Sequence, residues 1–313
     1  MRIPDYPSRD SDKWAQVDAW FSEMLAPEEP HLNFALSNNV KQGLPAHDVS
    51  ALQGKMLSIF IQMLRAVRVL EIGTLGGYST IWMAKALPQH GSVTTIEFNE
   101  HHAEVARQNI IKAGLAERVR LHTGAALDVL PTLEAPFDLI FIDADKVNNP
   151  HYLEWAIRLS HEGTVIVGDN TVRGGSVIDV DSDDPNIKGL RKFVQMISED
   201  KRLDATAMQT VGEKGWDGFV MAIVKAIWSP LYAKTLPNQK FVSTQMIVLA
   251  GLWLASMNSF RTSAFRSKRP SVYVLVRYVP KADNTDHWSA TVEQHHYIRY
   301  MFANIRTFPV ASG

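Results

Sequence analysis

The chain has 313 residues, of which 46% are hydrophobic and 21% charged, so it carries enough apolar material for a buried core and is neither a disordered nor a fibrous sequence. Its formal net charge of −1 gives no basic excess for contact with nucleic-acid phosphates, and we expect no nucleic-acid partner. The absence of cysteine excludes disulfides, thiolate metal sites and a cysteine nucleophile. It also fits a reducing compartment, so we expect a cytoplasmic protein.

Neither a secretory signal nor a membrane span is expected from the sequence. Residues 1–13 are polar and contain no apolar core. The longest apolar run, residues 246–255, is much shorter than the roughly 20 residues that a spanning helix needs.

The distribution of charge divides the chain into two parts. Residues 226–313 contain ten Lys and Arg residues and three Asp and Glu residues, whereas residues 1–225 hold the other 22 basic and 30 acidic residues. The regular alternation of helix and strand patterns also ends near residue 225. We therefore predict a folded domain over 1–225 and an atypical C-terminal extension over 226–313.

The chain before residue 66 is predicted to be helical. Trp14, Val17, Phe21 and Leu25 recur at spacings of three and four, and Ser50 is a suitable N-cap for a further helix. Helices are then expected at 50–64, 78–87, 100–113, 125–133, 152–159 and 185–197. Strands are expected at 67–72, 92–96, 119–122, 137–142, 164–167, 206–211 and 219–224.

The alternation of strands and helices determines the predicted fold class. Such strands pair in parallel through right-handed crossovers, and their continuous apolar runs indicate burial on both faces. Asp184 followed by Pro185 is typical of a helix start. The prediction is an α/β protein with a Rossmann-like, doubly wound, seven-stranded and mostly parallel sheet, preceded by N-terminal helices.

Acidic residues stand at the ends of four predicted strands. In a doubly wound sheet, ligands bind outside the carboxyl ends of the strands. Glu71, Glu97, Asp143 and Asp169 lie at or next to these ends, so we expect them to line one crevice.

A glycine-rich turn, residues 73–77, follows the first of these strands. Its sequence, Gly-Thr-Leu-Gly-Gly, departs from the G-x-G-x-x-G fingerprint of dinucleotide-binding proteins. Glu71 suits a cationic ligand better than a pyrophosphate, and Glu97 is placed to accept both hydroxyls of a ribose. A ligand with a ribose and a positive charge but no phosphate is S-adenosylmethionine (SAM), which we predict as the cofactor.

A second group of polar residues indicates a metal site. Asp143 ends one strand, and Asp169 with Asn170 ends the next, so three oxygen ligands can meet at one ion. An all-oxygen set favours Mg²⁺, with Mn²⁺ and Ca²⁺ as alternatives, over zinc. Lys146 can lie beside these oxygens, and a desolvated lysine near a metal ion can lose its proton. In a purely structural role, the two aspartates would cap helices and Lys146 would form a surface ion pair.

Six segments together form a specific pattern: Gln42-Gly-Leu-Pro45, Val49-Ser-Ala-Leu-Gln-Gly54, Leu70-Glu-Ile-Gly-Thr-Leu-Gly-Gly-Tyr-Ser79, Phe141-Ile-Asp-Ala-Asp-Lys146, Gly168-Asp-Asn170 and Gly215-Trp-Asp-Gly218. Through them, residues 30–225 resemble the cation-dependent, SAM-dependent O-methyltransferases, which include the catechol and caffeoyl-CoA O-methyltransferases. The Asp-Ala-Asp-Lys and Gly-Asp-Asn segments are the most specific part of this resemblance.

The resemblance implies a methyltransferase domain over 1–225 and roles for residues within it. It implies that Lys146, together with Asp143, is the catalytic base or charge stabiliser. Metal ligation is implied for Asp143, Asp169 and Asn170. The implied cofactor-binding residues are Val49, Glu71, Gly73, Thr74, Ser79, Glu97, Ala126, Asp143 and Asp145. Because family members pair through their N-terminal helices, the resemblance also implies a homodimer.

The expected substrate follows from the chemistry of methyl transfer. Transfer from a sulfonium is an in-line displacement that needs an aligned oxygen nucleophile, and chelation of two neighbouring hydroxyls by Mg²⁺ would activate one of them. A small catechol-like phenol meets this requirement. Family members that act on acyl-CoA phenols carry Trp-Asn directly after the Asp-Asn pair, where this chain has Thr171-Val-Arg-Gly174, so an acyl-CoA substrate is not expected.

Two other classes of protein remain as alternatives. A nicotinamide oxidoreductase would share the fold but needs a different glycine spacing and no metal triad. A non-catalytic SAM-binding protein would keep Glu71 and Glu97 but has no need of Lys146.

Overall fold

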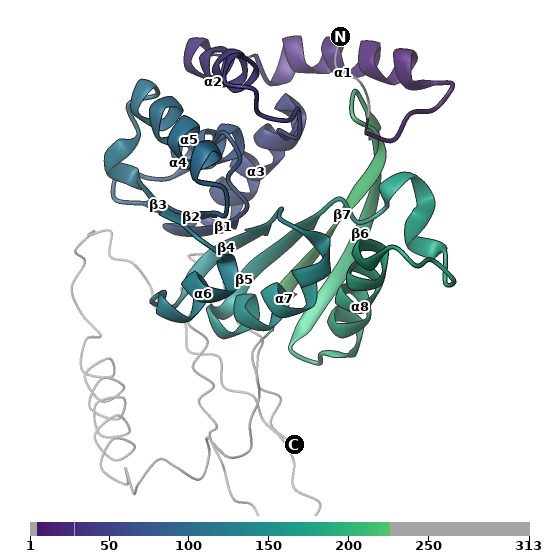
Figure 1. Cartoon of the computed structure of the whole chain (residues 1–313). Helices are drawn as coiled ribbons and strands as arrows, with labels where there is room; N and C mark the ends of the chain where they lie inside the picture. The colour runs from purple at the N-terminus through teal and green to yellow at the C-terminus, as the bar shows by residue number, and fades with distance from the viewer. Residues whose placement is uncertain (1–4, 28, 226–313) are drawn as a thin grey trace, which may run out of the picture. The chain divides into compact units, whose positions relative to one another are not determined.

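The computed structural model describes residues 5–27 and 29–225; the predicted C-terminal extension, residues 226–313, lies outside the described residues. Seven strands form one sheet in the order β3-β2-β1-β4-β5-β7-β6 (Figure 1). The strands are β1 (Arg68–Ile72), β2 (Ser92–Glu97), β3 (Val119–Thr123), β4 (Phe137–Ile142), β5 (Ser160–Asp169), β6 (Leu203–Gly212) and β7 (Gly215–Val224).

Helices precede the sheet and connect its strands. The α-helices are α1 (Ser11–Leu25), α2 (Pro30–Lys41), α3 (Ala51–Leu64), α4 (Tyr78–Ala86), α5 (Glu100–Lys112), α6 (Ala126–Val129), α7 (Asn149–Arg158) and α8 (Pro185–Glu199). None of the helices in the part of the chain that the structure describes has the length and apolar content needed to cross a bilayer.

The strand directions confirm the predicted fold class. β1 pairs in parallel with β2 and β4, β2 with β3, and β4 with β5. Only the last pairings differ, because β7 runs antiparallel to both β5 and β6. The sheet is therefore mostly parallel, as the sequence predicts, and the carboxyl ends of β1, β2, β4 and β5 meet at one edge.

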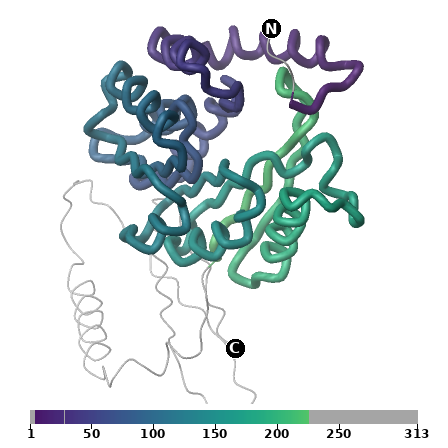
Figure 2. Tube along the Cα trace, in the orientation of Figure 1, coloured from purple at the N-terminus to yellow at the C-terminus, as the bar shows by residue number. Residues whose placement is uncertain are grey.

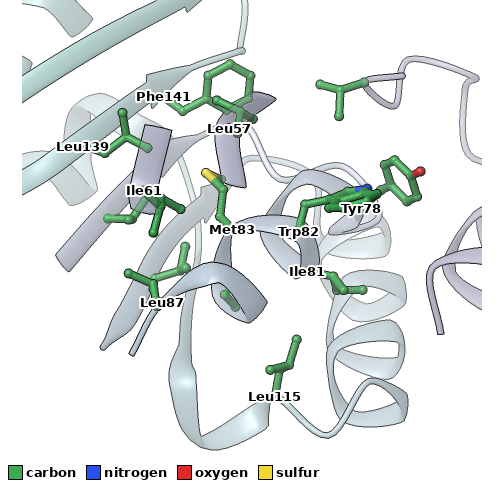
Figure 3. Packing of buried hydrophobic residues seen from close by; sticks show 14 of the residues in the cluster. Leu57, Ile61, Tyr78, Ile81, Trp82, Met83, Leu87, Leu115, Leu139 and Phe141 are labelled. Carbon is green, nitrogen blue, oxygen red and sulfur yellow. The ribbon is translucent and has the colours of Figure 1, made fainter. Parts of the chain in front are cut away.

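Both faces of the central strands are buried, because successive side chains of a strand point to opposite faces. Val69 and Leu139 belong to the core beneath α3 and α4, whereas the adjacent residues Leu70 and Ile140 belong to the core beneath α7 and α8. Figure 3 shows the first of these cores, in which Leu57 and Ile61 of α3 and Met83 of α4 gather near Leu139 and Phe141 of β4. Burial of each such side chain contributes about 1.5–3 kcal/mol, which fixes the strands that carry the acidic residues.

The N-terminal segment lies against the hairpin formed by β6 and β7, although the two are far apart in sequence (Figure 2). Asp18 Oδ2 of α1 accepts a hydrogen bond of 2.9 Å from the backbone N–H of Glu213 in the hairpin turn. Tyr6 forms a parallel bridge with Gly215, and its carbonyl oxygen accepts a 3.2 Å bond from the Trp216 N–H. These contacts bring α1 to the carboxyl edge of the sheet.

Element boundaries differ from the prediction where the apolar pattern is weak. β6 begins and ends outside the predicted 206–211, because Leu203 is its one buried residue and an edge strand of this kind shows little apolar contrast. The helix predicted over 125–133 is instead α6 followed by a 3₁₀ turn, Leu130–Thr132. The reason is that Pro131 has no N–H to continue the α-helical bonding. The predicted start of α8 is confirmed: Asp184 accepts from the Asn186 N–H, and Pro185 is the first helical residue.

Candidate active site

The acidic residues singled out in the sequence come together at the carboxyl edge of the sheet. In the parallel register Glu71 lies beside Thr95 of β2, and Ile142 lies beside Gly168 of β5. Asp143 therefore follows β4 next to the place where Asp169 ends β5. The Asp143 N–H also donates to the Ile72 carbonyl at 2.8 Å, which ties this loop to the end of β1.

The glycine-rich turn passes so close to neighbouring groups that side chains are excluded. Gly73 has a φ of +99°, and a Cβ atom there would overlap the carbonyl oxygen of Asp143. A Cβ atom at Gly76 would overlap the side-chain amide of Asn39. The Gly76 carbonyl also accepts a 2.8 Å bond from Asn109 Nδ2 of α5, so the turn is held from both sides.

Glu97 at the end of β2 holds the backbone of this turn. Its Oε2 accepts the N–H groups of Thr74 at 3.1 Å and Leu75 at 2.8 Å, and its Oε1 accepts the Asn99 N–H at 2.9 Å. A carboxylate has about four acceptor positions, so these three bonds leave capacity for a ligand hydroxyl. Glu97 therefore also fixes the backbone of the glycine-rich turn, a role that the sequence did not indicate.

Glu71 is completely buried and its carboxylate is surrounded by hydroxyl groups. Ser79 Oγ donates to it at 2.5 Å and Thr95 Oγ1 at 2.7 Å, and Thr80 Oγ1 is a third donor. Burial raises the pKa of Glu71 to about 7, against the opposing effect of these hydrogen bonds. The carboxylate is therefore satisfied within the protein, next to the turn.

Three further predicted cofactor residues, Thr74, Ala126 and Asp145, follow the carboxyl ends of β1, β3 and β4. Thr74 Oγ1 lies 2.6 Å from Thr95 Oγ1. The Gly124 N–H donates to the Glu97 carbonyl at 2.9 Å, which brings Ala126 at the start of α6 to the same edge. Asp145 accepts from Tyr152 Oη at 2.5 Å.

Val49 precedes the N-cap of α3, where Ser50 and Gln53 form a reciprocal capping box. It lines a cavity of about 460 Å³ between the N-terminal helices and the start of α4.

Asp143, Lys146 and Asp169 form a second cluster, beside Asn170. Lys146 is buried, and its Nζ lies 3.2 Å from Asp143 Oδ1. Asp169 Oδ1 accepts the Asn170 N–H at 2.8 Å, whereas its buried Oδ2 has no hydrogen-bond partner within residues 5–27 and 29–225. Burial, and then the charge of Asp143, raise the pKa of Asp169 to about 7, while Lys214 and Lys146 oppose the shift.

These residues fit a hard divalent cation. A buried carboxylate oxygen without a partner is costly, and a cation would compensate it. No group of three or more His, Cys, Asp or Glu side chains suited to a metal ion occurs in residues 5–27 and 29–225. The predicted set is consistent with this finding, because its third ligand is the amide of Asn170.

A cavity of about 210 Å³ opens beside Asn170. Its lining includes the apolar side chains of Leu52 and Met56 from α3 and of Phe219 from β7. Polar side chains in the lining include Lys214 from the turn between β6 and β7 and Asp217 from β7. Sequence reasoning did not find this cavity, because its walls come from segments far apart in the chain. Several lining residues, among them Leu52, Asn170 and Asp217, belong to the segments that carry the family resemblance, but nothing in those segments indicates that they share a cavity.

Comparison with known proteins agrees with this fold. The family model described as O-methyltransferase matches residues 23–223. A catechol O-methyltransferase of Mycobacterium tuberculosis is 51% identical over 210 residues, which cover 67% of this chain and 95% of that protein. A catechol O-methyltransferase of Niastella koreensis is 46% identical over 213 residues, covering 67% and 96%.

Solved structures show the same relationship. An O-methyltransferase of Bacillus cereus in complex with SAH (S-adenosylhomocysteine) superposes with a TM-score of 0.68 at 52% identity, covering 69% of this chain and 100% of that one. An O-methyltransferase of tomaymycin synthesis from Streptomyces achromogenes, in complex with SAM, has a TM-score of 0.68 at 44% identity, covering 70% and 100%.

The sheet order and these neighbours define the class of protein as a Rossmann-like methyltransferase. Within that class, the chain belongs to the O-methyltransferase family. The predicted resemblance is thereby confirmed, and the nicotinamide oxidoreductase and the non-catalytic protein are set aside.

The raised pKa of Glu71 predicts a specific pH dependence of stability. With a pKa near 7 in the folded state and an ordinary value near 4.5 when unfolded, Glu71 favours folding below pH 4.5, and this contribution is lost as the pH rises through 7. Glu71→Gln removes the titration, so we expect the parent to lose up to about 3 kcal/mol more than the variant between pH 5 and pH 8. Urea unfolding of both proteins in EDTA measures the difference. Parallel pH profiles would contradict the assignment.

Proposed function

We propose that this chain transfers the methyl group of SAM to one hydroxyl of a small catechol-like phenol, with Mg²⁺ or another divalent cation held by Asp143, Asp169 and Asn170. The observation that carries the proposal is the buried Oδ2 of Asp169, which lies beside Lys146 and Asp143 and has no hydrogen-bond partner in the described part of the chain. The names of the catechol O-methyltransferase relatives and the SAM- and SAH-bound neighbours support the donor and the acceptor. The absence of cysteine fits a reducing compartment, and the proposal includes a cytoplasmic location.

The residues of the turn would hold the methyl donor. Glu97 has remaining acceptor capacity for a ribose hydroxyl, and its three backbone bonds keep the carboxylate in place. Val49, Glu71, Gly73, Thr74, Ser79, Ala126, Asp143 and Asp145 complete the proposed cofactor set.

Lys146 would control the proton of the acceptor hydroxyl. In the transfer, the bond from the methyl carbon to sulfur breaks with its electron pair remaining on sulfur, while a bond from oxygen to the methyl carbon forms and the hydroxyl proton leaves. A bound divalent cation would act as a Lewis acid that favours loss of this proton. Lys146, held at 3.2 Å by Asp143, is placed to accept the proton or to stabilise the resulting oxyanion.

The cavity beside Asn170 has apolar walls, Leu52, Met56 and Phe219, that suit an aromatic ring.

Asp169→Ala tests the metal site directly. We expect the variant to lose metal-dependent methylation of catechol while its affinity for SAM stays close to the parent value, because Asp169 belongs to the oxygen cluster and not to the turn. Calorimetric titration with SAM and a turnover assay with and without EDTA measure both properties. Asp204→Ala, which removes an exposed carboxylate at the other end of the sheet, is the matched control. Full activity of Asp169→Ala, or a parent enzyme that is indifferent to EDTA, would refute metal assistance.

We also propose a homodimer formed through α1. Trp20 and Met24, one turn apart on this helix, are 60% and 64% exposed, and Val17 extends the same apolar stripe. Trp20→Glu is expected to shift the molar mass measured by light scattering from that of two chains to that of one, because a buried carboxylate would oppose association. Lys13→Glu, a charge change at the beginning of the same helix, is the control. A parent protein with the mass of one chain would rule out the dimer.

Residues 1–225 are proposed to be the whole catalytic domain. The family match ends at residue 223, and β7 completes the sheet at Val224. A chain ending at residue 225 should therefore be soluble and methylate catechol at the rate of the full-length protein. Two apolar runs beyond it, 246–255 and 272–279, are the reason to measure the melting temperature as well. An insoluble or inactive 1–225 would show that the remainder is part of the enzyme.

A further inference from the structure

Asp217, in the Gly215-Trp-Asp-Gly218 segment, is buried beside the proposed metal ligands and accepts four hydrogen bonds. Its Oδ1 accepts the backbone N–H groups of Val172 at 3.0 Å, Arg173 at 2.9 Å and Gly218 at 2.9 Å. Its Oδ2 accepts the side-chain Nδ2 of Asn170 at 3.1 Å. One oxygen therefore holds the loop after β5, and the other contacts the amide of Asn170.

The contact with Asn170 determines which way that amide faces. An ionised carboxylate is an acceptor only, so the amide atom that faces Asp217 must be the donor Nδ2, and the carbonyl oxygen must lie on the opposite side. The backbone of Asn170 is fixed as well, with a φ of +54° and its N–H bonded to Asp169 Oδ1. The amide of Asn170 can then differ only by the exchange of its oxygen and nitrogen positions. The contact with Asp217 determines which of these two orientations it adopts.

We infer that Asp217 is a positioning residue that turns the amide oxygen of Asn170 toward the divalent cation. The inference rests on the proposed metal site. Hard cations bind the amide oxygen and not the amide nitrogen, so an Asn170 with its amide reversed would lose its ligand atom. Groups behind metal ligands commonly have this role, and their replacement lowers metal affinity about 10–100-fold.

The variant Asp217→Asn separates this role from simple support of the loop. The introduced amide keeps an oxygen for the three backbone donors, but it presents its own nitrogen to Asn170. Two facing donors repel, so the amide of Asn170 is expected to reverse and use its oxygen to accept from residue 217. We expect Mn²⁺ to bind about 10–100-fold more weakly, with SAM affinity unchanged. Mn²⁺ binding is measured by electron paramagnetic resonance of the free ion, and SAM binding by calorimetry.

A double-mutant cycle with Asn170→Asp tests whether Asp217 acts by orienting the amide of Asn170. A carboxylate at position 170 has oxygens on both sides and cannot be turned the wrong way. Asp217→Asn should therefore cost Mn²⁺ affinity when residue 170 is Asn and little or none when it is Asp. An equal loss in both backgrounds would overturn the inference, because it would mean that Asp217 acts through its charge or through the loop.

Melting temperatures measured in EDTA test the contact between residues 170 and 217 in the absence of metal. This measurement remains informative even if one variant folds poorly. Asp217→Asn should lower the melting temperature of the parent but raise that of Asn170→Asp, where it removes a carboxylate–carboxylate contact. The same sign in both backgrounds would contradict the contact. Asp138→Asn is the matched control, since Asp138 also accepts two backbone N–H groups, from Val67 and Arg68, but lies at the opposite edge of the sheet. Its Mn²⁺ affinity should equal that of the parent.

Mn²⁺ binding by the parent and by Asp217→Asn distinguishes failure of the metal site from failure of the role of Asp217. A parent protein that does not bind Mn²⁺ refutes the metal part of the proposed function. A parent that binds Mn²⁺, with an Asp217→Asn variant that binds it equally well, refutes only the role of Asp217.

Discussion

The structure depends on the withdrawal of several carboxylates from water at one edge of the sheet. Glu71, Glu97 and Asp169 are all buried there, and Asp143 lies beside them. An uncompensated buried charge costs several kcal/mol, so each of these groups needs a partner. The kind of partner differs from one carboxylate to the next along the edge. Hydroxyls surround Glu71, backbone N–H groups surround Glu97, and the Lys146 side chain contacts Asp143.

Asp169 is the member of this set whose compensation is incomplete, because its Oδ2 has no hydrogen-bond partner among the residues that the structure describes. The surrounding chain maintains this arrangement. Parallel pairing fixes β4 beside β5, the Gly73 turn packs on the carbonyl of Asp143, and Asp217 holds the loop after Asn170. The proposed catalytic oxygens are thus positioned by rigid elements, while the cavity beside them is lined by side chains from α3 and from the β6–β7 hairpin. In the proposed function, acceptor selection and chemistry would belong to different parts of the fold.

Local sequence patterns were sufficient for the sheet and for the residues at its edge. The parallel core follows from apolar runs, whereas the bounds of the edge strand β6 do not, because its apolar pattern is weak. The clustering of Asp143 with Asp169 follows from parallel topology alone. Partners in space could not be predicted in the same way. Asp18 binds the N–H of Glu213, 195 residues away, and nothing in either segment indicates the other. Glu71 was interpreted from its charge, yet its hydroxyl partners are determined by how α4 and β2 pack. The Gly215-Trp-Asp-Gly218 segment identified Asp217 as notable but did not reveal its contact with Asn170.

The central claim is that the oxygens of Asp143, Asp169 and Asn170 form one cation site. Crystals of the full chain grown with S-adenosylhomocysteine and Mn²⁺ would test it most directly, through an anomalous difference map collected near the manganese absorption edge. The account predicts a peak within bonding distance of an oxygen from each of the three residues, with the amide nitrogen of Asn170 still facing Asp217. A map without a peak at these oxygens, in crystals that contain the cofactor product, would contradict it.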